Sequence, residues 1–236
     1  MGDGCATIAF FRGGHLGDLA AERLPMGLTT YVVLLFSLSF HEAAHAWAAL
    51  RMGDDTALRH GRITLNPLAH IDPVGTVLIP LLQIFWGGIP LLGWARPTPY
   101  NPGNFRRDRT VAQGHVLVAG AGPLSNFFLA LVFTAVLFVA FRAGGGELPR
   151  PAWFLLSSGI QMNVALALFN LVPLPPLDGS KVASWSLPRS VGQRYDRVME
   201  PYGQWILLVL FATGILGWLL YPAMSVVSHV LYQLAR

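Results

Sequence analysis

The sequence predicts an all-α, polytopic membrane protein with four or five transmembrane helices. Hydrophobic residues make up 53% of the 236 residues and charged residues only 12%, against about 25% charged residues in an average soluble domain. The mean hydropathy is +0.51. The apolar stretches are also too long and too poor in charge for the core of a soluble protein. We therefore expect a multi-pass protein of the cell membrane.

The apolar segments follow one another along a single membrane domain. Clear spans are predicted at residues 25–50, 111–141, 153–172 and 204–220. Polar connectors separate them at 51–73, 95–109, 142–150 and 178–201. The chain accordingly divides into an N-terminal segment (1–24), an intramembrane domain (25–222) and a C-terminal tail (223–236).

Residues 74–94 are apolar but carry signals against a clean crossing. Pro80, Pro90 and the Gly87-Gly88 pair fit a short helix and a turn better than an unbroken span. Irregular backbone at membrane depth is tolerated where it is buried in protein or lines a cavity. Residues 74–102 therefore contain a fifth crossing, a re-entrant segment or a short β-hairpin.

Two prolines, Pro97 and Pro99, stand two residues apart within this region. In an extended strand both missing N–H donors face the same edge. The arrangement blunts that edge against unwanted pairing, or it leaves the opposite edge to hold a substrate as an added strand. We favour the first interpretation.

The basic residues lie in the connectors rather than along one face. The net charge is +4 and the isoelectric point about 9.6, but no basic stripe with interleaved aromatic residues is present, so nucleic-acid binding is not expected. Counting Lys and Arg by side places the connector at 178–201 in the cytoplasm, whether or not residues 74–94 cross. The single cysteine excludes an internal disulfide and a cysteine-rich metal site.

The strongest functional signal is His41-Glu42-Ala43-Ala44-His45, inside the first apolar span. Residues four apart share a face of a helix, so His41 and His45 can occupy two corners of a zinc site, with Glu42 as general base. Ionisable groups at membrane depth are costly and mark functional sites. Two helix histidines making ordinary hydrogen bonds fit this apolar setting less well.

A catalytic zinc site usually takes three protein ligands and keeps a fourth position open. Asp178 is the best candidate for the third ligand because it follows a proline-rich stretch, 170–177, that must break the incoming helix. Broken helix ends deliver ligands to buried sites. From spacing alone, Asp178 is equally well interpreted as a helix cap. The other candidates are His60, His70, Asp72, His115 and His229.

His70 and Asp72 lie in a segment rich in turn signals, since Asn66-Pro67 and Asp72-Pro73 flank it. The two side chains could bind a second metal or line a path for water. A turn is the favoured interpretation, because Asn-Pro and Asp-Pro pairs are typical of turns.

Three motifs together resemble the site-2 protease family of intramembrane zinc metalloproteases. The HEAAH helix, the AGPLSN segment at 121–126 and the NLVPLPPLDG segment at 170–179 occur in this order, all in apolar surroundings. The resemblance implies one Zn²⁺ per chain, held by His41, His45 and Asp178, with Glu42 as the base. Residues 66–73 and 93–97 resemble the compact branch of the family, without inserted PDZ or trailing CBS domains.

The resemblance implies an endopeptidase that cuts a membrane-embedded protein or peptide within or near its transmembrane segment. Its partners would be that substrate and the lipid bilayer, and its active site would face the cytoplasmic side. Asn126 and Asn170 are candidates for oxyanion stabilisation or substrate positioning, because a neutral amide in an apolar span is costly unless it is used. Hydrogen bonding between helices is the alternative for both.

Two other classes of function remain as alternatives. One is a catalytically silent membrane protein that binds metal or serves as a scaffold, although a structural zinc site has no use for a base beside its ligands. The other is a metal transporter, which would call for ligands along a path and inverted repeats. The sequence indicates neither the substrate nor the oligomeric state.

Overall fold

The computed structural model describes residues 24–86 and 93–235, and within these ranges it is helical, without strands. Four described helices are long and apolar enough to cross a membrane: α3 (Leu24–Arg51), α6 (Val111–Ala143), α7 (Arg150–Asn170) and α10 (Ile215–Leu234). The predicted all-α membrane class is therefore confirmed.

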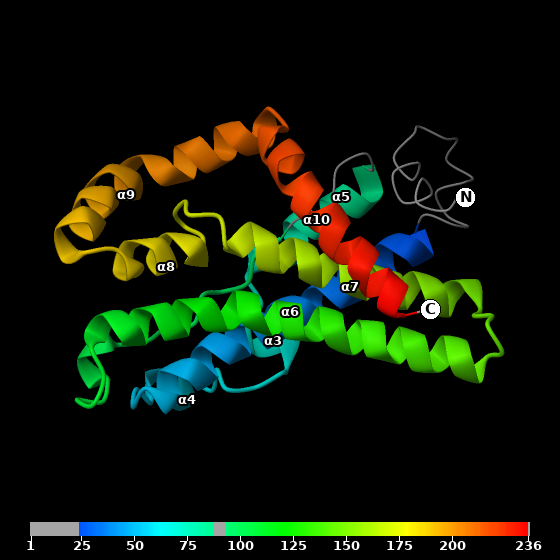
Figure 1. Cartoon of the computed structure of the whole chain (residues 1–236), viewed down its shortest axis with the longest axis horizontal. Helices are drawn as coiled ribbons and strands as arrows, with labels where there is room; N and C mark the ends of the chain where they lie inside the picture. The colour runs from blue at the N-terminus through cyan, green and yellow to red at the C-terminus, as the bar shows by residue number, and fades with distance from the viewer. Residues whose placement is uncertain (1–23, 87–92, 236) are drawn as a thin grey trace.

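The bundle is built on α6 and α7, which run antiparallel beside each other, with α3 packed against both (Figure 1). α6 begins with a capping box, in which Thr110 and Gln113 each accept a hydrogen bond from the other's backbone N–H. A core of buried apolar residues joins α6, α7 and α10. Its members are Ala130, Leu137, Leu156, Ile160, Val164, Leu231 and Ala235.

The apolar segment after residue 73 forms no helix long enough to cross a membrane within its described residues. It forms η4 (Pro73–Leu78) and α5 (Ile79–Trp86), capped by Asp72 and too short to span a bilayer. Trp94 N–H donates to Gly75 O at 3.2 Å, so the chain is back beside η4 at residue 94. Residues 93–100 are extended without a strand partner, and 87–92 of the possible hairpin lie outside the described residues.

The connector between α3 and α6 is folded against the end of α3. It contains the short helices α4 (Thr56–Arg59), η3 (Pro67–Ala69) and η5 (Pro102–Asn104). The buried Asp54 carboxylate holds the connector's two ends together by accepting hydrogen bonds from Thr56, Asn101 and Asn104.

The region after α7 differs from the prediction. The expected polar connector at 178–201 is helical, with α8 (Asp178–Ser186) followed by α9 (Arg189–Ala212), which begins directly after Pro188. The predicted span at 204–220 is wrong, because Gly214 adopts a left-handed φ of 75° and separates α9 from α10. α10 then continues through the expected boundary at residue 222. The sequence is apolar on both sides of Gly214, so hydropathy does not reveal the break between α9 and α10.

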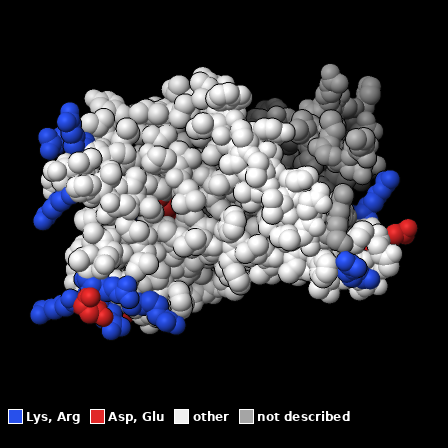
Figure 2. All heavy atoms as spheres, viewed as in Figure 1, with Lys and Arg blue, Asp and Glu red and all other residues white. Residues whose placement is uncertain are grey.

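Charged side chains gather at the two ends of the molecule on the face shown in Figure 2, and a broad band between them is almost free of charge. This distribution fits a protein whose middle lies in the hydrocarbon layer. α8 and α9 lie at one end of the bundle, and α9 arches away from α7 toward α10 (Figure 1).

Candidate metal centre

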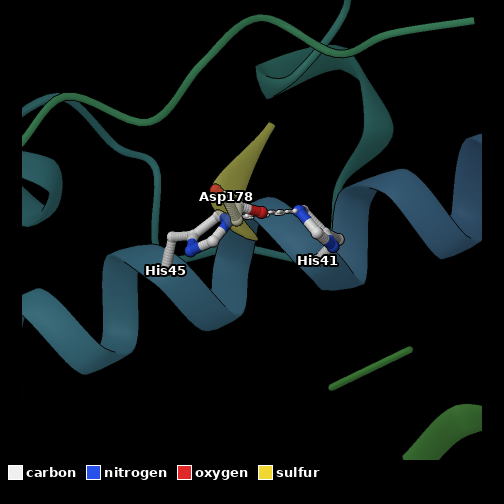
Figure 3. Close-up of side chains that lie close together, drawn as sticks. All are labelled: His41, His45 and Asp178. Atoms are coloured by element: carbon white, nitrogen blue, oxygen red, sulfur yellow. Dashed lines mark hydrogen bonds and ion pairs between the residues drawn. The ribbon is translucent and has the colours of Figure 1, made fainter. Parts of the chain in front are cut away.

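Three of the predicted ligands converge at one point between α3 and α8. His41 and His45 extend from α3 toward Asp178, which enters from the opposite side at the start of α8 (Figure 3). His41 Nε2 lies 3.1 Å and His45 Nε2 3.2 Å from Asp178 Oδ2. The two Nε2 atoms lie 3.0 Å apart. Both histidines are buried, and the Asp178 side chain is 15% exposed.

This triangle fits a zinc ion. With zinc–ligand bonds of about 2.0–2.2 Å and tetrahedral angles, neighbouring ligand atoms lie about 3.3–3.5 Å apart. The observed separations of 3.0–3.2 Å are close to that spacing. Two imidazoles and a carboxylate are also a donor set that zinc prefers. His41, His45 and Asp178 can therefore hold a metal ion.

The second ring nitrogen of each histidine is fixed by a neighbour on α6. His45 Nδ1 donates to Val118 O at 2.7 Å. A carbonyl oxygen only accepts, so Nδ1 carries the hydrogen and Nε2 of the neutral ring is left as the ligand atom. His41 Nδ1 lies 2.6 Å from Asn126 Oδ1. Metal-binding histidines are commonly held in this way.

Gly122 provides the space that the two rings occupy. A Cβ at this position would lie closer than 3.0 Å to His45 Nε2 and to Cε1 of both histidines. Only glycine allows α6 to approach α3 so closely at this level. The AGPLSN segment at 121–126 thus contributes both room for the rings, at Gly122, and a partner for His41, at Asn126.

Asp178 reaches the histidines through the backbone turn that precedes it. Pro173, Pro175 and Pro176 end the helical path of α7, and the Pro175–Pro176 peptide is cis. Asp178 is the first residue of α8, not its N-cap, which is Leu177. A Cβ on Gly179 would collide with the backbone of Leu171 and Val172. Glycine is therefore needed to fold α8 back against the end of α7.

α9 supports the same turn from its other side. Tyr195 OH donates to Pro173 O at 2.7 Å. Gly203 packs so closely on Pro175 that a Cβ would lie 2.5 Å from the proline ring. The segment that carries the third ligand is thus held between α7 and α9.

Glu42 is held by the segment at residues 93–100, which lies between α5 and η5 in the sequence. Thr98 N–H donates to Glu42 Oε2 at 2.8 Å, and Thr98 Oγ1 donates to the Glu42 backbone carbonyl at 3.0 Å. Along one edge of the segment, three backbone N–H groups donate hydrogen bonds. Trp94 donates to Gly75 O, Arg96 to His70 O and Thr98 to Glu42 Oε2. Pro97 and Pro99 face the other edge. The edge that could have held a substrate as an added strand is therefore already occupied by the protein's own hydrogen bonds.

A cavity of about 750 Å³ opens beside the metal centre. Its walls come from α3, the segment 93–100, the ends of α7 and α8, and the apolar half of α9, including Trp205, Leu208 and Phe211. Glu42, His41, His45 and Asp178 all line it. A peptide in this cavity would meet the base and the metal ligands together.

Asn126 and Asn170 are placed differently. Asn126 is fully buried beside His41, and its Nδ2 group bonds to Asn163 Oδ1 and Ser37 O. Asn170 lines the cavity and donates to Leu166 O. An oxyanion role stays a prediction, and Asn170 is the one positioned to meet a substrate.

The other candidate ligands lie apart from the metal centre. His70 is buried and its Nε2 lies 2.9 Å from Thr64 O, while Asp72 caps η4, so both belong to the turn favoured from the sequence. His115 stacks on Trp185, and His60 and His229 are exposed. Among the described residues, only His41, His45 and Asp178 form a group suited to a metal.

Sequence reasoning missed Asn163 and Thr98, and it included Gly122 only as part of the AGPLSN segment, without a role of its own. Asn163 carried the same signal as Asn126, a neutral amide inside an apolar span. Thr98 and Gly122 act through a backbone N–H and a missing side chain, which no residue pattern reveals.

Comparison with known proteins gives several relatives along most of the chain. The Bacillus subtilis protein "Putative zinc metalloprotease YwhC" is 40% identical over 206 residues, which is 85% of this chain and 89% of that protein. Two proteins named "Putative zinc metalloprotease Rip2" are similar over 87% of this chain. The Mycolicibacterium smegmatis protein is 30% identical with 77% of its length covered, and the Mycobacterium tuberculosis (strain H37Rv) protein 33% identical with 78% covered.

No family model and no solved structure matches the chain. The relatives carry the assignment, together with a donor set that suits zinc and four helices able to cross a membrane. The chain belongs to the family of zinc metalloproteases that includes YwhC and Rip2.

Proposed function

We propose that this protein is an intramembrane zinc endopeptidase of the site-2 protease type. The observation that carries the proposal is the convergence of His41, His45 and Asp178 beside Glu42, on the wall of a cavity between membrane-spanning helices. A metal site that served structure alone would need neither the carboxylate of Glu42 nor the adjoining cavity.

The chemistry assigns a role to each residue of this group. Bound zinc would polarise the scissile carbonyl and lower the pKa of a water molecule. Glu42 takes the proton from the attacking water oxygen as it bonds to the carbonyl carbon. When the carbon–nitrogen bond breaks, Glu42 returns that proton to the leaving amine. Asn170, on the cavity wall, would donate to the developing oxyanion.

The substrate is a membrane-embedded protein or peptide, cut within or near its transmembrane segment. Most residues that line the cavity are apolar, and several of them come from α7 and α9, which suits an apolar peptide. We place the active site toward the cytoplasmic side, because the connectors that flank the metal centre, 51–110 and 178–202, hold most of the basic residues.

The test measures bound zinc and peptide cleavage on the detergent-purified full chain. The variants are Glu42→Gln and Asp178→Ala, with His60→Ala as a control that removes an exposed histidine outside the site. We expect about one zinc per chain and cleavage of a transmembrane peptide in wild type and in the control. Glu42→Gln should keep zinc and lose cleavage, because its amide cannot take a proton. Asp178→Ala should lose zinc.

Other outcomes would favour the alternatives. Cleavage by Glu42→Gln at the wild-type rate would exclude Glu42 as the base. Zinc binding without cleavage of any peptide in a panel of transmembrane sequences would favour a silent metal-binding protein. Metal uptake into vesicles without peptide cleavage would favour a transporter.

A further inference from the structure

A chain of buried amide groups runs from His41 across three helices. Asn126 of α6, Asn163 of α7 and Ser37 of α3 are fully buried. His41 Nδ1 lies 2.6 Å from Asn126 Oδ1, and Asn126 Nδ2 donates to Asn163 Oδ1 at 2.9 Å. Asn163 Nδ2 in turn donates to Ser37 Oγ and to Gly159 O, each at 2.9 Å. Groups in such a network orient one another.

Two backbone carbonyls fix the direction of this amide chain. The oxygens of Gly159 and Ser37 accept hydrogen bonds and cannot donate them. Gly159 O therefore requires the NH₂ group of Asn163, which turns Asn163 Oδ1 toward Asn126. Ser37 O lies 3.3 Å from Asn126 Nδ2 and, with Asn163 Oδ1, requires the NH₂ group of Asn126. Asn126 Oδ1 must then face His41.

The direction of the amide chain determines the tautomer of His41. Because Asn126 Oδ1 only accepts, His41 Nδ1 must carry the hydrogen, and Nε2 of the neutral ring keeps its lone pair. This Nε2 atom lies 3.1 Å from Asp178 Oδ2 and 3.0 Å from His45 Nε2, where the metal would bind. A flipped Asn126 would present NH₂ to Nδ1, favour the hydrogen on Nε2 and remove the ligand atom.

We propose that Asn126 and Asn163 are positioning residues of the metal centre, which select the His41 tautomer whose Nε2 binds the metal. The proposal rests on the part of the proposed function that assigns a metal centre to His41, His45 and Asp178. It does not depend on proteolysis. It also gives the AGPLSN segment a chemical role, because this segment supplies the first amide of the chain.

The test compares zinc affinities by competition with a chromogenic chelator. Asn126→Leu keeps the approximate shape and removes the acceptor, so zinc binding should weaken about 10- to 100-fold, as for other groups that orient a metal ligand. Asn126→Asp keeps an acceptor for His41 and loses the donors to Asn163 and Ser37. It should bind zinc within about threefold of wild type while melting at a lower temperature. Asn163→Leu should weaken zinc binding less than Asn126→Leu does.

Thr134→Val is the matched control. Thr134 is a buried polar residue of the same helix, and its hydroxyl bonds only to Ala130 O among the described contacts. It should leave zinc affinity unchanged. Unchanged affinity in Asn126→Leu would overturn the proposal. Equal loss in Asn126→Leu and Asn126→Asp would also overturn it, since the residue would then act through packing alone.

A second measurement needs no metal. In zinc-free protein labelled with ¹⁵N-histidine, ring nitrogen shifts should show a hydrogen on Nδ1 of His41 in wild type and partial loss of that hydrogen in Asn126→Leu. A His41 ring without a hydrogen on Nδ1 in wild type would overturn the proposal even if zinc binds. If wild type bound zinc and showed the hydrogen of His41 on Nδ1 but cut no peptide, the proposed function would fail and this inference would stand.

Discussion

The two halves of the metal centre are held in place by different means. The histidine half lies on α3, and each ring is fixed through its Nδ1 atom by a buried partner on α6. The aspartate half depends on the backbone, because the proline turn and Gly179 set where Asp178 enters. One half is thus fixed by side-chain hydrogen bonds inside the bundle, and the other by the path of a turn at its edge. The two should respond to substitution differently.

The largest effect should come from Gly122→Ala, which crowds the histidine half. The new Cβ would collide with both rings, and neither can move away without losing its Nδ1 hydrogen bond. Overpacking costs about 1–3 kcal/mol, so zinc affinity should fall by about 100-fold at the upper end of that range. Gly120→Ala is the control, since a Cβ there meets nothing within 4 Å. Equal zinc affinities in the two variants would contradict the steric role of Gly122.

Gly179→Ala should have a smaller effect, because it disturbs the aspartate half. Its Cβ would collide with the backbone of Leu171 and Val172 and displace the start of α8. We expect zinc affinity and cleavage to fall about tenfold, because Asp178 would still reach the metal but from a displaced position. Gly217→Ala on α10, where a Cβ has open space, serves as the control. An effect as large as that of Gly122→Ala would show that both halves are equally rigid.

Thr98→Pro tests the base separately from either half. Proline has no N–H, so the hydrogen bond to Glu42 Oε2 is lost, while Thr98→Val keeps that N–H and loses only the hydroxyl. Because Glu42 would no longer be oriented, cleavage should fall about tenfold at unchanged zinc content. Steady-state kinetics together with metal analysis would check this. A larger fall in cleavage for Thr98→Val than for Thr98→Pro would contradict this prediction.

Asp54→Asn should have the smallest effect on catalysis and a clear effect on stability. Burial alone would raise the pKa of the Asp54 carboxyl, but hydrogen bonds from Thr56, Asn104 and Asn101 lower it overall. A carboxyl with a lowered folded pKa stabilises the fold above the unfolded value of about 3.9 and loses that contribution as pH falls. The variant should be less stable by about 1–3 kcal/mol at neutral pH.

Thermal unfolding at several pH values would check this. The difference in unfolding temperature between Asp54→Asn and wild type should shrink below about pH 4, as the wild-type carboxyl takes up its proton. Cleavage at neutral pH should change less than about threefold, because Asp54 lies in the connector and not in the cavity wall. If the difference in stability between Asp54→Asn and wild type did not change with pH, the ionised Asp54 carboxylate would not be the cause of that difference.

Much of the membrane domain was predictable from the sequence, because hydropathy and helix periodicity depend on local composition. The HEAAH motif placed His41 and His45 on one helical face, and the proline-rich stretch singled out Asp178, which the structure brings beside them. The helical structure of residues 178–203 is not predicted by the sequence, since this stretch is polar and typical of a connector. The break at Gly214 depends on one backbone angle within a continuous apolar run. The contacts of Gly122, Thr98 and Asn163 join distant segments, and local patterns do not encode them.

α9 connects two parts of the site. One continuous helix carries Tyr195 and Gly203, which contact the proline turn, and Trp205, which lines the cavity. Gly203 and Trp205 are only two residues apart, so the part of α9 that packs on the turn before Asp178 adjoins the part that a substrate in the cavity would touch.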